Sequence, residues 1–133
     1  MNDQYNGALD VLTTQLVEDA GVVVVVLTGE VDMVTERSPL AKAVEALERA
    51  PAGLVIDLQG VTFFGSSGMA LLLTVQQDAQ QRGVPFAVVA AHHAVLAPLA
   101  MTGTDVLLPL FANLPDALAA VRATPAVPPQ QRR

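Results

Sequence analysis

Two serines framed by glycines, Gly65-Ser66-Ser67-Gly68, form the strongest candidate for a functional site in this sequence. They precede the stretch 69–82, which is rich in Leu, Gln and Ala, has a helical pattern and stops at Gly83. The first amides of a helix are unpaired and partly positive, so this position can hold an anion. A phosphate on a serine here would add roughly −1.5 to −2 charges. The competing interpretation is structural, with Ser66 capping the helix and the glycines forming the turn.

Two enzymatic interpretations of the same residues do not fit. A hydrolase nucleophile elbow needs Gly-x-Ser-x-Gly, but Met69 stands where the last glycine should follow Ser67. A phosphate-binding loop needs a Gly-Lys pair before its Ser or Thr, and the single lysine, Lys42, lies elsewhere. Because no base, nucleophile and oxyanion donor converge, we expect a protein that is not an enzyme and has no catalytic residues.

Acidic residues supply the second candidate. Glu30 and Asp32 follow a valine-rich strand in a predicted loop, where a carboxylate can bind a metal, act as a base or meet a partner's basic group, or simply be solvated. Asp57 lies inside an apolar strand, so we expect it to accept a hydrogen bond from a loop amide. His92 and His93 are adjacent and diverge, and no third ligand has metal spacing. We expect no metal and no cofactor.

The elements that position these residues follow from periodicity and from glycine and proline punctuation. We expect strands at 9–17, 22–27, 53–58, 85–91 and 106–111. Helices are expected at 38–51, with Ser38 as cap and Pro39 in the first turn, at 69–82, at 93–102 and from Asn113 or Pro115 to 123. The β-branched run at 22–27 should be covered on both faces. Strands that alternate with helices predict an α/β fold with a mostly parallel sheet.

Composition narrows the function classes. Apolar residue types make up 52% of the 133 residues and charged types 15%, which favours a single folded domain. The last two arginines lie in the tail, so residues 1–123 carry thirteen acids against five Lys and Arg, a net −8. An acidic body with one Tyr and four Phe disfavours nucleic-acid binding. The absence of Cys excludes disulfides and thiolate chemistry.

No targeting segment is visible. The apolar run 21–27 is far shorter than the roughly 20 residues of a spanning helix. The longer stretch 84–101 is interrupted by Pro85, Pro98 and the two histidines, and the first ten residues lack a signal-peptide pattern. We therefore expect a cytoplasmic protein without a membrane partner.

The serine motif and the acidic loop together resemble motifs of a known family. The stretch LVIDLQGVTFFGSSGMALLL is similar to the signature of STAS domains, in which a strand leads through an aromatic position to Asp-Ser-Ser-Gly and a helix. LTGEVDMVT resembles the family's Gly-Glu-(Leu/Val)-Asp loop, at the right distance upstream. The resemblance covers roughly 9–122 and implies a STAS-like mixed sheet of about five strands with about four helices. We accordingly expect an N-terminal extension at 1–8, the domain at 9–123 and a disordered, proline-rich tail at 124–133.

The resemblance implies a bacterial anti-sigma-factor antagonist. Such proteins bind an anti-sigma factor, often a serine kinase, and thereby release a sigma factor for transcription. The kinase phosphorylates a serine of the motif, which falls here on Ser67 with Ser66 as neighbour, and a metal-dependent phosphatase of the PP2C type reverses the modification. The implied partner-binding residues are Glu30, Asp32, Gly65, Ser66, Ser67, Gly68 and Met69.

One residue departs from the family pattern. Gly65 stands where the family usually has Asp, which removes a carboxylate from the recognition surface. Three consequences are open: weaker kinase docking, a different partner, or a domain that binds without being switched. A non-switching scaffold, or a sensor of a small ligand or nucleotide, is thus the alternative function. The Ala- and Leu-rich helix at 69–81 would also permit a homodimer, although burial against the sheet explains its composition equally well.

Overall fold

A five-stranded sheet with helices on both faces forms the body of the protein. The computed structural model describes residues 12–32, 35 and 37–124. The strands are β1 (Leu12–Asp19), β2 (Val22–Val31), β3 (Gly53–Phe64), β4 (Phe86–Val89) and β5 (Leu110–Phe111). The helices are α2 (Arg37–Glu48), α3 (Ser66–Arg82), α4 (His93–Thr102), the 3-10 helix η1 (Thr104–Leu107) and α5 (Leu114–Ala123).

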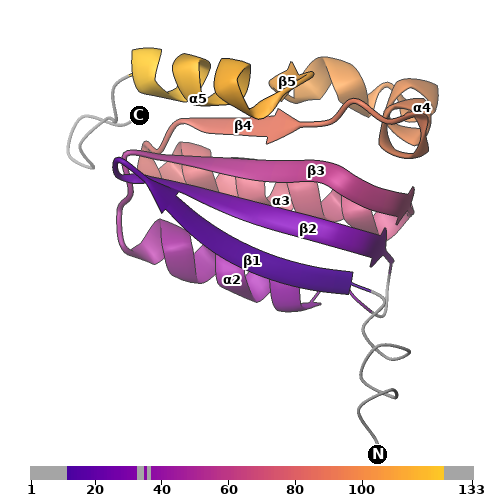
Figure 1. Cartoon of the computed structure of the whole chain (residues 1–133), viewed down its shortest axis with the longest axis horizontal. Helices are drawn as coiled ribbons and strands as arrows, with labels where there is room; N and C mark the ends of the chain where they lie inside the picture. Colours follow the sequence, from indigo (N-terminus) through magenta and orange to yellow (C-terminus); the bar gives the residue numbers. More distant parts are fainter. Residues whose placement is uncertain (1–11, 33–34, 36, 125–133) are drawn as a thin grey trace, which may run out of the picture.

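The strand order is β1-β2-β3-β4-β5 (Figure 1). β1 is antiparallel to β2, and the remaining neighbours are parallel. This arrangement confirms the predicted mixed, mostly parallel sheet with crossover helices. Within the described residues, no helix has the length and apolar character needed to cross a bilayer.

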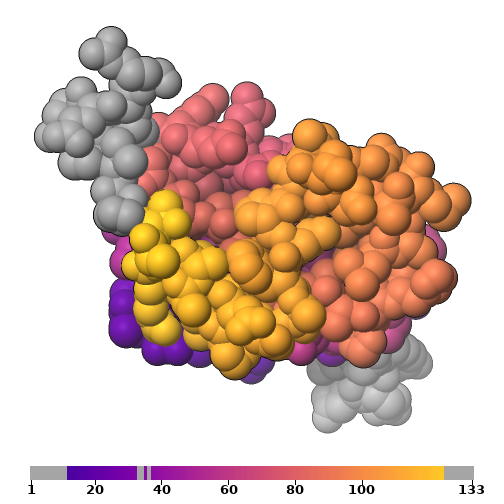
Figure 2. Space-filling view, turned by 90° about the horizontal axis from the view of Figure 1, so that it is seen from above, coloured from indigo at the N-terminus to yellow at the C-terminus, as the bar shows by residue number. Residues whose placement is uncertain are grey.

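Two apolar clusters hold the layers together, one on each face of the sheet. On one face, residues of α2, α3 and α4 pack against the sheet; the largest fully buried side chains there include Leu27, Leu47 and Leu72. On the other face, α5 covers Val22, Val24 and their neighbours. The prediction that the valine run is covered on both faces is therefore confirmed. Figure 2, seen from the top of Figure 1, shows α5 and the α4 region side by side on this surface of the molecule.

Two sequence predictions at the carboxyl ends of the central strands were wrong. The strands were expected to end at residues 27 and 58, with Glu30 and Asp32 in a loop, but β2 extends to Val31 and β3 to Phe64. The two extensions pair with each other across two register shifts, which mark bulges. Gly60 permits this pairing, because a Cβ there would lie 2.9 Å from Thr28 Oγ1. Long-range pairing thus overrode the local turn signals.

Three other boundaries also differ from prediction. The expected last strand at 106–111 is divided into η1 and the short β5, because Pro109 between them cannot donate a backbone hydrogen bond. Ser38 is the second residue of α2 rather than its cap. The first strand begins at Leu12, and its expected start at 9–11 lies outside the described residues, as do the expected extension at 1–8 and tail residues 125–133.

Several expected elements are confirmed. α4 spans His93–Thr102 as predicted, and Gly83 ends α3 in the left-handed conformation at φ 70°. Asn113 caps α5, since its side-chain oxygen accepts from the amide of Asp116 at 2.8 Å. At the amino ends of the strands, Arg122 of α5 pairs with the Asp19 carboxylate at 3.0 Å and joins the last helix to the first hairpin.

Truncation of the core should be costly, whereas truncation of an exposed leucine should not. Leu72 is fully buried between α3 and the sheet, so Leu72→Ala should lower the free energy of unfolding by about 2–5 kcal/mol. Leu107 is 59% exposed, and Leu107→Ala should change it by less than about 0.5 kcal/mol. Urea denaturation of both variants measures the difference, and equal losses would contradict the assigned core.

Candidate functional site

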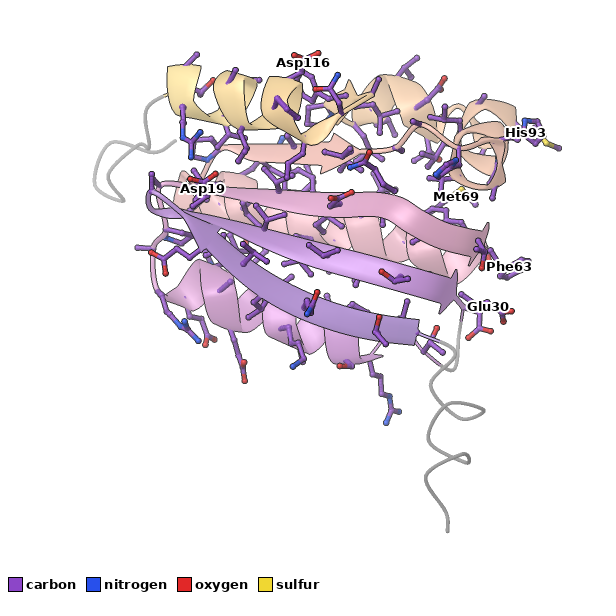
Figure 3. All side chains as sticks on the ribbon, viewed as in Figure 1. Asp19, Glu30, Phe63, Met69, His93 and Asp116 are labelled. Carbon is purple, nitrogen blue, oxygen red and sulfur yellow. The ribbon has the colours of Figure 1, made fainter. Side chains whose placement is uncertain are left out.

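The two predicted motifs are neighbours at the carboxyl ends of the central strands. Strand pairing places Glu30 opposite Phe63 and Val31 opposite Phe64. The amide of Gly65 then donates to the carbonyl oxygen of Val31 at 3.0 Å. Figure 3 shows Glu30, Phe63, Met69 and His93 at this same end of the sheet. The fold therefore presents the acidic loop and the serine-bearing helix start on one surface.

Asp32 stabilises the turn that follows β2. Its amide donates to Thr35 Oγ1 at 2.9 Å, and its Oδ1 accepts from the amide of Thr35 at 3.1 Å. Thr35 Oγ1 also donates to the carbonyl oxygen of Glu30 at 2.8 Å. Asp32 is half-buried, whereas Glu30 is exposed. Of the two acids expected to meet a partner, Glu30 is the more accessible, and Asp32 shapes the loop that presents it.

The helix with the two serines begins earlier than predicted. Gly65 is the N-cap of α3, with extended backbone at φ −90° and ψ −174°, and Ser66 is the first helical residue rather than the capping residue. No side chain caps this helix start. The carbonyl oxygen of Gly65 accepts from the amides of Gly68 and Met69 at 3.0 and 3.3 Å, which begins the helical ladder. The structural interpretation of Ser66 as the cap was therefore wrong.

The residues of the motif differ in accessibility. Ser66 is exposed, Gly65 and Ser67 are half-buried and Gly68 is buried. Met69 is half-buried, and its sulfur accepts a hydrogen bond from Thr102 Oγ1 at 3.3 Å, so its side chain joins α3 to α4. A partner can reach the two serines directly. Gly68, named from the sequence as a partner contact, lies inside the fold.

Gly68 allows α3 to pack closely on the end of β3. A Cβ at this position would lie 2.6 Å from Cε1 of Phe64, whose ring is 3% exposed. Such a distance is shorter than a carbon contact permits, and the buried ring has little freedom to move. The glycine that follows the serines thus sets the height at which they emerge from the surface.

Phe63 is a surface residue that the sequence analysis missed. Its side chain is 52% exposed near the end of β3, between Glu30 on the neighbouring strand and Gly65, the N-cap of α3. The Phe63-Phe64 pair carried the signal, because alternation along a strand sends one of two adjacent side chains outward. An exposed aromatic ring beside a hydroxyl-bearing helix start is typical of an interface anchor.

The remaining candidates have local roles. Asp57 is 7% exposed, and its Oδ1 accepts from the amide of Gln59 at 3.0 Å. The predicted backbone hydrogen bond is present, but its donor lies in β3 rather than in a loop. His92 is the N-cap of α4 and His93 its first residue, and both are exposed.

Comparison with known proteins identifies the family. The model of the STAS domain matches residues 13–117. The chain belongs to the STAS domain family. This STAS domain is 35% identical over 115 residues to the anti-sigma-F factor antagonist RsfB of Mycobacterium tuberculosis, covering 86% of this chain and 93% of that protein.

Solved structures agree with this assignment. An anti-sigma factor antagonist from Mycobacterium paratuberculosis is 36% identical with a TM-score of 0.77, covering 86% of this chain and 97% of that chain. The anti-sigma factor antagonist SpoIIAA in its unphosphorylated form is 21% identical with a TM-score of 0.71, covering 84% and 97%, and shares the fold. The family resemblance and the fold predicted for the STAS domain are confirmed.

Adding a methyl group at Gly68 should destabilise this STAS domain. Although alanine is the better helix former by about 1 kcal/mol, Gly68→Ala should lower the free energy of unfolding by about 1–3 kcal/mol through the contact with Phe64. Ser66→Ala is the matched control, because Ser66 makes no cap hydrogen bond, and it should change stability by less than about 0.5 kcal/mol. A stabilised Gly68→Ala protein in urea denaturation would contradict the close packing.

Restoring the family's carboxylate should strengthen the helix start. A Cβ at Gly65 would meet only ordinary contacts, at 3.4 Å and beyond, so Asp fits there and can accept from the free helix amides. Gly65→Asp should raise the free energy of unfolding by about 0.3–1 kcal/mol. Gly65→Ala adds the Cβ without the oxygen and should not stabilise. An equal gain for both variants in thermal or urea unfolding would exclude capping as the cause.

Proposed function

We propose that this STAS domain is an anti-sigma-factor antagonist that binds an anti-sigma factor of the serine-kinase type. The observation that carries this proposal is the hydrogen bond from Gly65 to Val31, which joins the Glu30 loop to the serine-bearing start of α3. The relative RsfB and the structure from Mycobacterium paratuberculosis, both described as antagonists of this kind, support the assignment. Binding releases a sigma factor and so regulates transcription, in the cytoplasm where transcription takes place.

The binding surface combines one aromatic anchor with small polar groups. Phe63 supplies apolar area, while Glu30, Ser66 and Ser67 supply hydrogen-bonding groups around it. Asp32, Gly65, Gly68 and Met69 contribute by holding the loop and the helix in place. A surface of this kind suits a protein partner that buries Phe63 and covers the helix start.

Phosphorylation of Ser67, or of its neighbour Ser66, is the proposed off-switch. The hydroxyl is small and neutral, whereas a phosphate near Glu30 would place like charges within one small interface. Bringing two anions out of water on binding is costly unless the partner pairs both. The kinase partner therefore binds the phosphorylated protein with lower affinity, and a phosphatase of the PP2C type restores binding by removing the phosphate.

Gly65 changes the charge next to the proposed phosphorylation site. The family's Asp would place a permanent carboxylate at the N-cap, next to the modified serine. With glycine there, the helix start carries no side-chain anion until phosphate is added. The phosphate would therefore be the first side-chain anion at this helix start, and the kinase has one carboxylate fewer to recognise.

The homodimer considered from the sequence does not use the apolar face of α3. Leu71, Leu72 and Val75 on that face are buried at 1% exposure or less within the core. The composition of α3 is explained by its packing on the sheet, and we propose a switch that acts through a single copy of the domain.

Charge at position 67 should decide binding. Ser67→Asp should weaken binding to the cognate anti-sigma factor by about tenfold or more, equivalent to about 1.4 kcal/mol, because it adds a second carboxylate to the surface that carries Glu30. Ser67→Ala should bind as well as the wild type. Ala119→Asp, an exposed position on α5, adds the same charge elsewhere and should have no effect. Isothermal titration calorimetry gives the three affinities.

The phosphorylation step is tested separately. Incubation with the cognate kinase and ATP, followed by mass spectrometry, should place one phosphate on Ser67 or Ser66, and Ser67→Ala tells the two acceptors apart. If neither serine carries phosphate and the partner still binds tightly, the switch is contradicted and the alternative holds, a scaffold that binds without being regulated. Equal affinity of Ser67→Asp and wild type would overturn the electrostatic mechanism.

A further inference from the structure

Exposed apolar side chains gather at the end of α4 and in η1. Six large apolar residues are exposed among the described residues, and three of them lie within positions 101–107. Met101 is 86% exposed, Val106 83% and Leu107 59%. Single exposed apolar residues are ordinary on a protein surface, whereas a group of them marks a site of interaction. These three residues form the α4–η1 surface.

This part of the chain carries almost no charge. Asp105 is the single Asp, Glu, Lys or Arg between Arg82 and Asp116. The core of a protein–protein interface is depleted of charged residues and enriched in Met and aromatic side chains. Met101 adds an unbranched side chain that adapts to the shape of a partner. The composition of the segment therefore suits a buried contact with another protein.

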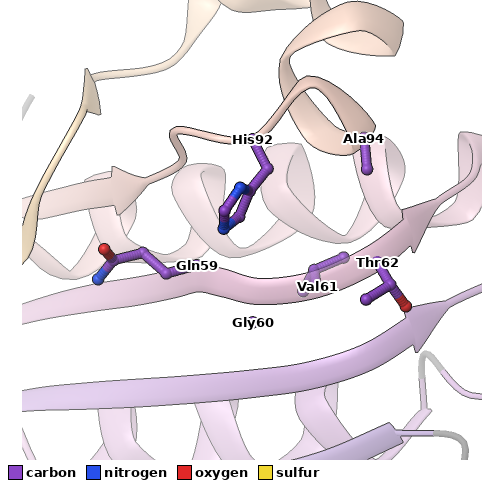
Figure 4. Close-up of a pocket in the computed structure, with 6 residues that line it drawn as sticks. All are labelled: Gln59, Gly60, Val61, Thr62, His92 and Ala94. Carbon is purple, nitrogen blue, oxygen red and sulfur yellow. The ribbon is translucent and has the colours of Figure 1, made fainter.

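The start of α4 lies beside β3 and offers no such contact. His92 and Ala94 line a cavity of about 370 Å³ together with residues 59–62 of β3 (Figure 4). The lining side chains are polar or small apart from Val61, which is 2% exposed. The large exposed apolar side chains therefore belong to the far end of α4 and to the 3-10 helix that follows it.

Hydrogen bonds place this segment beside the serine-bearing helix. Thr102 Oγ1, in the last turn of α4, donates to the sulfur of Met69 at 3.3 Å. Met69 follows Ser66 by three positions, a spacing that puts both residues on one face of α3. Seven positions after Met69, Gln76 Nε2 donates to the carbonyl oxygen of Leu107 at 2.9 Å. The α4–η1 segment therefore runs along α3 from its first turn toward its middle.

We propose that the α4–η1 surface is a second, apolar part of the anti-sigma-factor contact and binds an apolar groove of that partner. The inference rests on the proposed function, because the partner is the one that covers Phe63 and the serines. Phe63 reaches the helix start from β3, since a Cβ at Gly65 would lie 3.4 Å from its ring, and Thr102 reaches it from α4. A partner that covers the serines therefore meets apolar groups of both elements. Because the α4–η1 surface itself has no charge, its contribution should not depend on salt.

Polar replacement of the two most exposed side chains tests the contact. Met101→Gln combined with Val106→Thr keeps the size of both side chains but removes apolar surface. The double variant should bind the cognate anti-sigma factor about tenfold more weakly, by the same factor at low and high salt. Leu16→Gln with Val17→Thr is the matched control, because these residues are exposed on β1 at the other edge of the sheet, and it should not change the affinity. Isothermal titration calorimetry gives the affinities, and urea denaturation verifies that both variants fold.

Nuclear magnetic resonance of labelled methionine methyl groups locates the contact directly. In the full chain, the Met101 signal is assigned by its absence from Met101→Gln, and it should shift or broaden when the anti-sigma factor is added. An unchanged Met101 signal at saturation, or unchanged affinity of the double variant, would overturn the proposal and leave the proposed function intact. A dimeric wild type that becomes monomeric in the double variant would assign the surface to a second copy and would also overturn it. Absence of any anti-sigma-factor binding by the wild type would overturn the proposed function and this inference together.

Discussion

β2 and β3 pair in parallel over nearly their whole length, from Val22 opposite Gly53 to Val31 opposite Phe64, and the rest of the site depends on this contact. It buries the valine run and brings two motifs that are more than thirty residues apart in the sequence to the same sheet edge. The hydrogen bond from the Gly65 amide to the Val31 carbonyl oxygen then positions the start of α3 relative to the paired strands. The position of the serines is therefore a property of the central strands more than of the helix that bears them.

Most of the architecture could be predicted from the sequence because apolar periodicity and glycine or proline punctuation agree over most of the chain. The α4 helix and the asparagine cap of α5 follow from such local signals. Predictions failed where a distant partner overrode a local pattern. Glycine and polar residues at 28–32 favoured a loop, but pairing with β3 made the segment up to Val31 a strand. The division of the expected last strand likewise required the turn of the chain toward β5 and the proline before it.

The candidate site was predictable in its residues and less so in their roles. Spacing and residue type singled out Glu30, Asp32 and the two serines, and the structure brings them to one surface. Side-chain direction could not be inferred, so Asp32 was not expected to hold its own turn, and Phe63 was overlooked. Gly68 shows the same limit, because its role depends on the distance to a ring four residues earlier. With that contact tight, the start of α3 has little room to move relative to β3.

The ion pair between Arg122 and Asp19 has a practical consequence. It marks where the end of α5 meets the β1–β2 hairpin, at the amino ends of the strands, whereas the serines lie at the carboxyl ends (Figure 1). A second protein joined after Ala123 would therefore start at the opposite end of the sheet from the serines. A fluorescent reporter fused there would leave the serine-bearing surface uncovered.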